Sequence, residues 1–195
     1  MPIYDVQFKE IEHKYEVADD FDLGGFGADL TALRPIRTNG IQVHDRYFLT
    51  EAGPHRRFLL RHRLDSEIQQ FTLKSVDVDT EVRDEVNLDL GHHAGDQSAA
   101  VDAFVRHLGV RWSGTITKDL AVWYFDDCEV VHYRATAGAR AVRCVEFEAT
   151  RKNSLADALE IVERYERATG FFGVTRSRMS LPQLLFPELR DLLVV

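Results

Sequence analysis

Polar and apolar side chains alternate along much of this chain, and the pattern is clear near its start. The stretch FKEIEHKYEV (8–17) places Glu10, Glu12 and Lys14 on one side of an extended segment, with mostly apolar side chains on the other. Seven further segments are rich in β-branched or aromatic residues or alternate in the same way. The sequence therefore predicts eight strands, near 3–17, 41–50, 56–64, 67–75, 79–90, 112–125, 128–136 and 139–151.

Short polar links join several of these segments, among them EAGPH (51–55), DSE (65–67) and TAGA (136–139). Links of this kind are typical of hairpins, so the sheet should be mostly antiparallel. Closure into a barrel would remove the unpaired edges of such a sheet. We therefore expect an α+β fold in a single domain over 1–195, an eight-stranded antiparallel β-barrel (a tunnel) with flanking helices.

Helical periodicity appears between and after the strands. The sequence predicts helices over 96–109 and 153–170, each ended by a glycine, and the second capped by Ser154. A third is expected over 180–193, broken or kinked at Pro187. A short helical turn is expected near 28–35, and GGFG (24–27) is interpreted as a flexible loop because it lacks the context of a phosphate-binding loop.

Charged residues repeat at every second position on strand after strand. Because side chains two apart share a face of a strand, each set lies on one side of its segment. The sets are Glu10, Glu12 and Lys14; Arg61 and Arg63; Thr72 and Lys74; Glu81, Arg83 and Glu85; and Glu146 and Glu148. One interpretation is a solvated outer face. The other is a barrel interior, which in an eight-stranded barrel can hold side chains or a small ligand.

Charges inside a barrel must be paired or must hold an ion, because isolated buried charges are very costly. Carboxylates bind Mg²⁺ or Mn²⁺ through oxygen, and Arg and Lys bind phosphate oxygens. A tunnel lined by both kinds of side chain therefore favours a metal-bound polyphosphate as ligand.

Composition limits the classes of function. The chain has 195 residues, 45% hydrophobic and 29% charged, with a formal charge of −8, which argues against broad binding to nucleic acid. No apolar run reaches the length of a membrane span, and the N-terminal residues do not resemble a signal peptide. Two cysteines, Cys128 and Cys144, are too few for a disulfide framework. We expect a reduced, cytoplasmic protein, as a monomer or homodimer.

The motifs EIEHK (10–14), LLRHR (59–63), FTLK (71–74), VRDEV (82–86), VEFEA (145–149) and RSRMSLPQLL (176–185) occur in an order that resembles the CYTH superfamily, or triphosphate tunnel metalloenzymes. The resemblance covers nearly the whole chain. It implies an eight-stranded antiparallel tunnel and relatives that include inorganic triphosphatases, thiamine triphosphatases and class IV adenylyl cyclases.

The resemblance also implies roles for individual residues. Mg²⁺ or Mn²⁺ would be held by Glu10, Glu12, Glu146 and Glu148, which with Lys14 would form the catalytic set. Phosphates would be bound by Lys14, Arg61, Arg63, Lys74, Arg83, Lys118 and Arg178, and Glu85 would extend the network.

Three departures from the family pattern concern the tunnel. Leu49 stands where the family has an acid, and Leu120 where a second base is expected. Residues 130–145 contain no acid, although the family usually has an Asp about ten residues before the late E-x-E. Because this segment carries arginines instead, we expect an altered second half of the tunnel. Arg134 or Arg143 should lie near the far wall, which is the wall that carries Glu146 and Glu148.

The eight histidines do not form a zinc-binding spacing. His92 and His93 are expected in a solvated loop, and His13 and His62 on the outward strand face, whereas the alternation leaves the side of His132 open. Three functions remain in view: metal-dependent hydrolysis of a triphosphate, an adenylyl cyclase reaction, and binding of a nucleotide or polyphosphate without catalysis.

Overall fold

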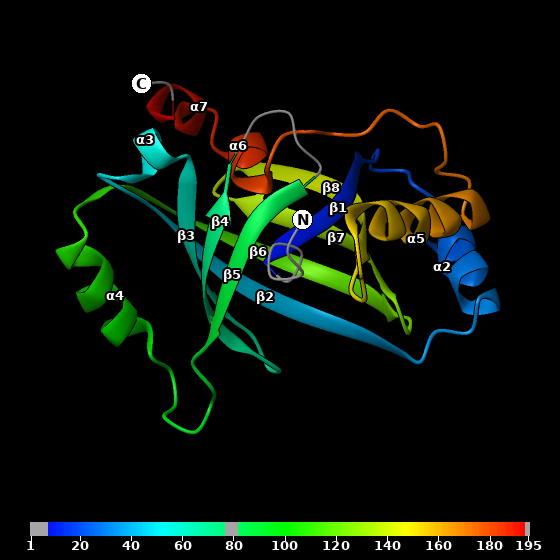
Figure 1. The fold of residues 1–195 in the computed structure, drawn as a ribbon, viewed down its shortest axis with the longest axis horizontal. Helices are drawn as coiled ribbons and strands as arrows, with labels where there is room; N and C mark the ends of the chain where they lie inside the picture. Colours follow the sequence, from blue (N-terminus) through cyan, green and yellow to red (C-terminus); the bar gives the residue numbers. More distant parts are fainter. Residues whose placement is uncertain (1–7, 77–81, 194–195) are drawn as a thin grey trace.

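The computed structural model describes residues 8–76 and 82–193 of the chain. Its elements follow one another as β1 (Lys9–Glu16), α2 (Leu23–Ala32), β2 (Arg37–Thr50), α3 (Gly53–Arg56), β3 (Phe58–Leu64), β4 (Gln69–Ser75), β5 (Val82–Asp89), α4 (Ser98–His107), β6 (Val110–Tyr124), β7 (Cys128–Ala137), β8 (Arg140–Ala149), α5 (Leu155–Ala168), α6 (Leu181–Leu185) and α7 (Glu188–Leu192) (Figure 1). Of the strands expected near 3–17 and 79–90, residues 3–7 and 79–81 lie outside the described part.

The described strands form a closed barrel in the order β1-β5-β4-β3-β2-β6-β7-β8, and every neighbouring pair is antiparallel. The predicted α+β fold, a tunnel with flanking helices, is therefore confirmed. The two long strands β2 and β6 pair along most of their length and form the longest ladder. Closure leaves one set of alternating side chains facing the interior and the other facing the helices or solvent.

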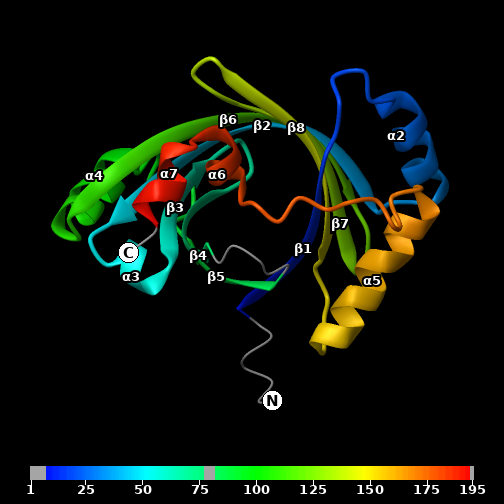
Figure 2. The ribbon, with the colours of Figure 1, turned by 90° about the horizontal axis from the view of Figure 1, so that it is seen from above.

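Helices cover the outside of the barrel on two sides. Helices α2 and α5 pack against β1, β7 and β8 through an apolar cluster that includes Phe26, Phe147 and Val162. Helix α4 lies on the other side (Figure 2), where Val101 and Val105 pack against Phe48 and Leu60. These outer contacts direct the apolar neighbours of Glu10, Arg61 and Glu146 outward, so the charged residues at alternate positions of these strands point inward.

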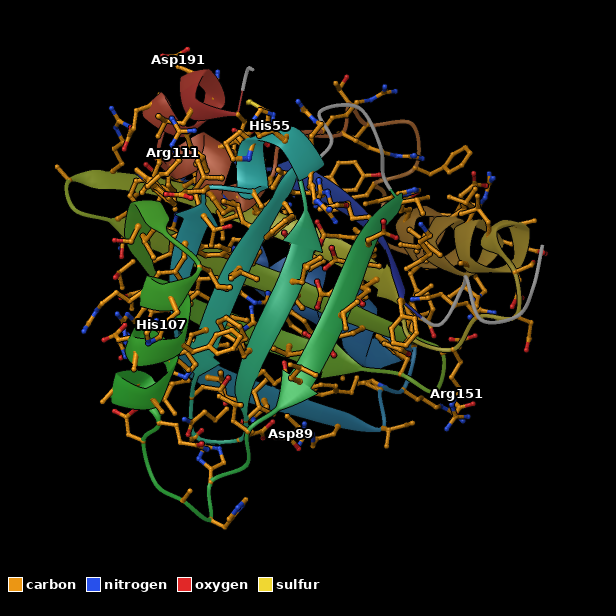
Figure 3. All side chains as sticks on the ribbon, turned by 60° about the vertical axis from the view of Figure 1, so that its left-hand side comes forward. His55, Asp89, His107, Arg111, Arg151 and Asp191 are labelled. Carbon is orange, nitrogen blue, oxygen red and sulfur yellow. The ribbon has the colours of Figure 1, made fainter. Side chains whose placement is uncertain are left out.

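The C-terminal helices lie over one end of the barrel. Leu181 and Leu185 of α6 and Leu189 of α7 pack among interior apolar side chains such as Leu49 and Ala137. His55 and Asp191 lie near this end of the barrel, whereas Asp89, the last residue of β5, lies at the other end (Figure 3). The expected break at Pro187 is confirmed, because this residue separates α6 from α7.

The loop expected at 24–27 is wrong, since these residues belong to α2. The Asp22 side chain caps the helix by accepting a hydrogen bond from the Gly25 backbone N–H. Phe26 is buried against Trp123, and a Cβ at Gly27 would lie 3.3 Å from the same indole ring. Tertiary packing against the barrel therefore overrides the low helix propensity of the glycines.

Candidate functional site

The interior of the barrel contains a cavity of about 110 Å³ lined by equal numbers of acids and bases. The strand alternation brings them together: Glu10 and Glu12 from β1 lie 7% and 8% exposed, and Lys14, Arg61 and Arg83 are at most 5% exposed. All expected site residues except Arg178 line this cavity. The charged lining residues are Glu10, Glu12, Lys14, Arg61, Arg63, Lys74, Arg83, Glu85, Lys118, Glu129, Glu146 and Glu148.

Most of the charges of each sign occupy different parts of the barrel, and the exceptions on the lining are Lys14 on β1 and Glu85 on β5. Five bases form a basic arc on β3, β4, β5 and β6: Arg61, Arg63, Lys74, Arg83 and Lys118. Five acids form an acidic arc on the neighbouring strands β7, β8 and β1: Glu10, Glu12, Glu129, Glu146 and Glu148. This separation gives one side of the cavity the chemistry of a phosphate site and the other that of a hard-cation site.

Each cavity lysine near the acidic arc is held by two glutamates. Lys14 Nζ lies 2.8 Å from Glu12 Oε1 and 3.1 Å from Glu146 Oε1. Lys74 Nζ lies 2.6 Å from Glu10 Oε1 and 2.9 Å from Glu85 Oε2. These pairs compensate the cost of burying the ammonium groups.

A row of three carboxylates crosses the acidic arc. Glu12 is the cross-strand partner of Glu148, and Glu148 is in turn the partner of Glu129. Burial, with the charges of nearby acids, raises the pKa of Glu148 well above its usual value and also raises that of Glu129. Burial acts on Glu12 in the same direction, but Lys14 and Arg83 outweigh it and hold the pKa of Glu12 well below its usual range.

The sequence did not indicate Glu129, because this acid lies one position before the segment 130–145 in which the family pattern places one. The expectation that arginines occupy the far wall is also wrong. Arg134 and Arg143 are cross-strand partners on the outer face, where Arg134 is exposed and Arg143 pairs with Asp19. The strand β7 therefore contributes an acid to the cavity, not a base.

Asp45 is a second acid that the sequence did not reveal. It is fully buried on β2 and accepts hydrogen bonds from Arg63 Nε at 2.8 Å and from Arg63 Nη2 at 3.0 Å. Its other neighbour is Lys118 Nζ, 2.8 Å away. Leu49, four residues later on the same strand, packs in the apolar end of the barrel, while Leu120 lines the cavity.

Several buried polar atoms in the cavity have no hydrogen-bond partner among the described residues. They include the donors Arg61 Nε and Arg83 Nε and the acceptor Glu10 Oε2. Because such atoms are costly, a cavity that holds them is suited to a ligand with both anionic and cationic parts. Burial raises the pKa of Glu10 to about 7, consistent with a carboxylate that lacks a full counter-charge.

These carboxylates fit Mg²⁺ or Mn²⁺ by chemistry, since both ions prefer oxygen ligands. Within residues 8–76 and 82–193, no group of three or more His, Cys, Asp or Glu side chains is already arranged to hold a metal. The lysine pairs account for this, because Glu10, Glu12 and Glu146 each face an ammonium group. Mg²⁺ commonly takes one or two carboxylates together with substrate phosphates, which suits this arrangement.

The Arg178 side chain does not enter the cavity. It is exposed, and only its backbone carbonyl lies near the site, 3.5 Å from Arg83 Nη2. Arg176 instead lies outside the barrel, with Nη1 3.1 Å from His13 Nε2. Glu166 of α5 accepts a hydrogen bond from Tyr15 there and lies 2.6 Å from His13 Nδ1, so a buried polar cluster supports the outer face of β1.

The remaining histidines and the cysteines lie away from the cavity. His13 and His62 face outward, as expected, and His132 also faces outward, where it stacks on Phe21. Cys128 and Cys144 are free and belong to apolar clusters on opposite sides of the barrel wall, so a bridge between them is excluded by geometry. No helix in the described part of the chain is long and apolar enough to cross a membrane.

Comparison with solved structures reveals similar barrels. The PH1012 protein from Pyrococcus horikoshii is 17% identical with a TM-score of 0.71, over 90% of this chain and 99% of that one. A putative adenylate cyclase from Bacillus halodurans is 19% identical, with a TM-score of 0.57 over 92% of this chain and 99% of its own. This chain has their fold.

A third similar structure is the putative adenylyl cyclase HpAC1 from Hippeastrum, described as having a dominant triphosphatase activity. It is 15% identical with a TM-score of 0.53, over 95% of this chain and 97% of that one. The likenesses agree with the fold that the CYTH resemblance implied. No model of a protein family matches the chain, and no curated protein matches it either.

Proposed function

We propose that this chain is a CYTH superfamily member that hydrolyses a triphosphate bound inside the barrel, with Mg²⁺ or Mn²⁺ as cofactor. The observation that carries the proposal is the separation of a basic arc from an acidic arc around one cavity, with unpaired buried donors and acceptors on its lining. The order of the sequence motifs and the shared fold support the same family.

On the phosphate side, Arg61 and Arg83 are the residues best placed to bind oxygen atoms. Each has a buried Nε–H without a partner among the described residues, and each guanidinium is charged at any working pH. Arg63 and Lys74 extend this surface along β3 and β4. Fixed donors of this kind stabilise negative charge that develops on phosphate oxygens during phosphoryl transfer.

On the cation side, Glu10, Glu12, Glu146 and Glu148 would hold the metal, and Glu129 adds a fifth carboxylate beside Glu148. When bound, Mg²⁺ or Mn²⁺ would neutralise phosphate charge and lower the pKa of a water molecule. Glu10 offers an oxygen without a hydrogen-bond partner among the described residues.

Lys14 and Lys74 connect the two sides. Each is bound by two glutamates, so neither can give its full charge to a phosphate until those carboxylates have another cationic partner. We therefore expect cation and triphosphate to bind with positive cooperativity, because each relieves the charges that the other leaves unpaired.

An adenylyl cyclase reaction is the second candidate, favoured by the fold shared with putative adenylate cyclases. Binding of a nucleotide or polyphosphate without catalysis is the third. Both would use the same basic arc, so the products separate the three functions.

The decisive experiment incubates the protein with Mg²⁺ or Mn²⁺ and with tripolyphosphate, ATP or thiamine triphosphate. We expect release of orthophosphate or diphosphate without cyclic AMP. Formation of cyclic AMP from ATP would establish the cyclase instead. Binding by calorimetry without any product would leave a binding module, and the absence of both binding and turnover would contradict the proposal.

A further inference from the structure

Asp45 is an acid embedded in the basic arc. It lies on β2, between β3, which carries Arg63, and β6, which carries Lys118. Its carboxylate takes two hydrogen bonds from Arg63, at 2.8 and 3.0 Å, and contacts Lys118 Nζ at 2.8 Å. Its side chain is 0% exposed, so Asp45 touches these bases while they, and not Asp45, line the cavity.

A carboxylate at this place has a cost for a site that binds anions, because it repels phosphate. The contacts of Asp45 show what the site gains from this carboxylate. The bidentate contact uses Nε and one Nη of Arg63 and so fixes the guanidinium plane, which leaves the remaining donors available to the cavity. Lys118 is held by the second oxygen of the same carboxylate.

We propose that Asp45 is a positioning residue of the triphosphate site, which orients Arg63 and keeps the Lys118 ammonium group charged so that both can bind the ligand. The inference rests on the proposed function, since it assumes that the cavity takes a polyanion. It assigns a role to a residue that the sequence motifs did not single out.

The electrostatic surroundings of Lys118 support this role. The charged and titratable groups that face it are Asp45 on β2, Arg61 and Arg63 on β3, and the Tyr133 ring on β7, with Nζ 5.8 Å from the ring centre. Burial, followed by the charge of Arg63, lowers the pKa of Lys118 to about 8, and Asp45 opposes this shift. Removal of the carboxylate should therefore lower the pKa further and discharge Lys118 within the neutral range.

The test measures binding of tripolyphosphate in the presence of Mg²⁺ by calorimetry, between about pH 6.5 and pH 8.5. For each variant the affinity is divided by the wild-type affinity at the same pH, which removes the protonation of the ligand itself. In Asp45→Asn this ratio should fall about tenfold from the lower to the higher pH, because one pKa unit changes the charged fraction about tenfold.

Two matched variants complete the design. Adding Lys118→Arg to Asp45→Asn, and dividing the affinity by that of the Lys118→Arg single variant at the same pH, should give a ratio that does not change with pH, because arginine stays charged throughout this range. Asp119→Asn removes a charge from the exposed outer face of the same strand as Lys118 and should leave the ratio near one. If Asp45→Asn does not unfold cooperatively, Asp45→Glu replaces it. That variant keeps the charge but displaces the carboxylate, so it should weaken binding about tenfold at every pH.

A ratio for Asp45→Asn that does not change with pH, a pH dependence that Lys118→Arg does not flatten, or wild-type affinity in Asp45→Glu would each overturn the inference. Failure of the proposed function has a different signature. In that case the wild-type protein itself would not bind tripolyphosphate at any pH, with or without Mg²⁺.

Discussion

Glu12 of β1 and Glu148 of β8 are direct partners in an antiparallel ladder, and both side chains line the cavity. Like charges placed opposite each other on neighbouring strands are destabilising. Lys14 compensates Glu12, at 2.8 Å, whereas the pKa of Glu148 is raised well above its usual value by burial and by the surrounding acids. We therefore expect the barrel to gain most stability from a bound cation at this pair.

We expect the effect of Glu148→Gln on the melting temperature to change sign when the metal is added. In the presence of a chelator at pH 8 the variant should melt at a higher temperature than wild type, because the folded wild-type protein must either bury this charge or take up a proton to neutralise it, and both cost free energy. With saturating Mg²⁺ or Mn²⁺ it should melt at a lower temperature. Thermal melts of both proteins under both conditions measure this, and a variant that is less stable than wild type in chelator would contradict the prediction.

Glu10 and Glu146 should contribute unequally to the cation site. One oxygen of Glu10 has no hydrogen-bond partner within residues 8–76 and 82–193, whereas Glu146 accepts a hydrogen bond from Tyr133 at 2.5 Å and pairs with Lys14. Ligand at a hundred times its Kd stabilises a protein by about 2.7 kcal/mol. Glu10→Gln should remove most of the Mg²⁺-dependent rise in Tm, and Glu146→Gln less. Equal losses would show that both strands contribute equally.

The double replacement of Arg61 and Arg63 by Ala should abolish tripolyphosphate binding. Two charge-assisted hydrogen bonds of about 1.5 kcal/mol or more each predict a loss of at least about a hundredfold in affinity. The matched control is the double replacement of Arg134 and Arg143 by Ala, which removes the same charge from the outer face of the barrel. Calorimetry should show near wild-type affinity for the control, and equal losses in the two double variants would point to net charge alone.

The metal-free protein should become less stable as the pH rises through the titration of Glu10. The pKa of this carboxyl is raised from 4.5 to about 7, so between these values the folded state binds more protons than the unfolded state. The destabilisation is complete above pH 7 and amounts to at most about 3 kcal/mol. In chelator, the Tm of Glu10→Gln minus that of wild type should therefore increase from pH 5 to pH 8. A constant difference would show that Glu10 titrates normally.

Glu166 should be essential for stability although it lies outside the cavity. Its replacement by Ala would leave His13, Tyr15 and the neighbouring Arg176 with buried polar groups that have lost an acceptor. We expect a loss of about 3 kcal/mol or more in the free energy of unfolding, measured with denaturant. Glu163→Ala removes an acid from a more exposed part of the same helix and should cost less than about 1 kcal/mol.

The local alternation of polar and apolar residues was sufficient to predict the barrel and many of the residues that line it. The alternation in EIEHK, LLRHR and FTLK assigns Glu10, Arg61 and Lys74 to one face of their strands, and the structure brings those faces together. The helices outside the barrel pack against the apolar faces of the strands, so the charged faces must point inward. Strand period and motif order therefore contain most of the information on this part of the fold.

The residues that were missed depend on pairing between distant segments. Asp45 is an ordinary acid in the sequence, and only the registers of β2 with β3 and β6 place it between Arg63 and Lys118. Glu129 lies one residue before the segment in which the family pattern places an acid, and only its pairing with Glu148 in the β7–β8 ladder shows that it belongs to the site. The position of the Arg178 side chain could not be predicted for another reason. The segment before α6 is not a strand, so no alternation indicates where its side chains point.

If the cavity binds a triphosphate as we propose, the equal numbers of acids and bases on its lining should also make it selective among the anions of a solution. A bare sulfate or orthophosphate ion would have to compete with carboxylates that already hold the lysines. A polyphosphate complexed with a divalent cation carries both signs of charge in one particle and can replace both partners of each internal pair. We therefore expect the barrel to discriminate against abundant simple anions, because its own carboxylates compete with them for the basic side chains.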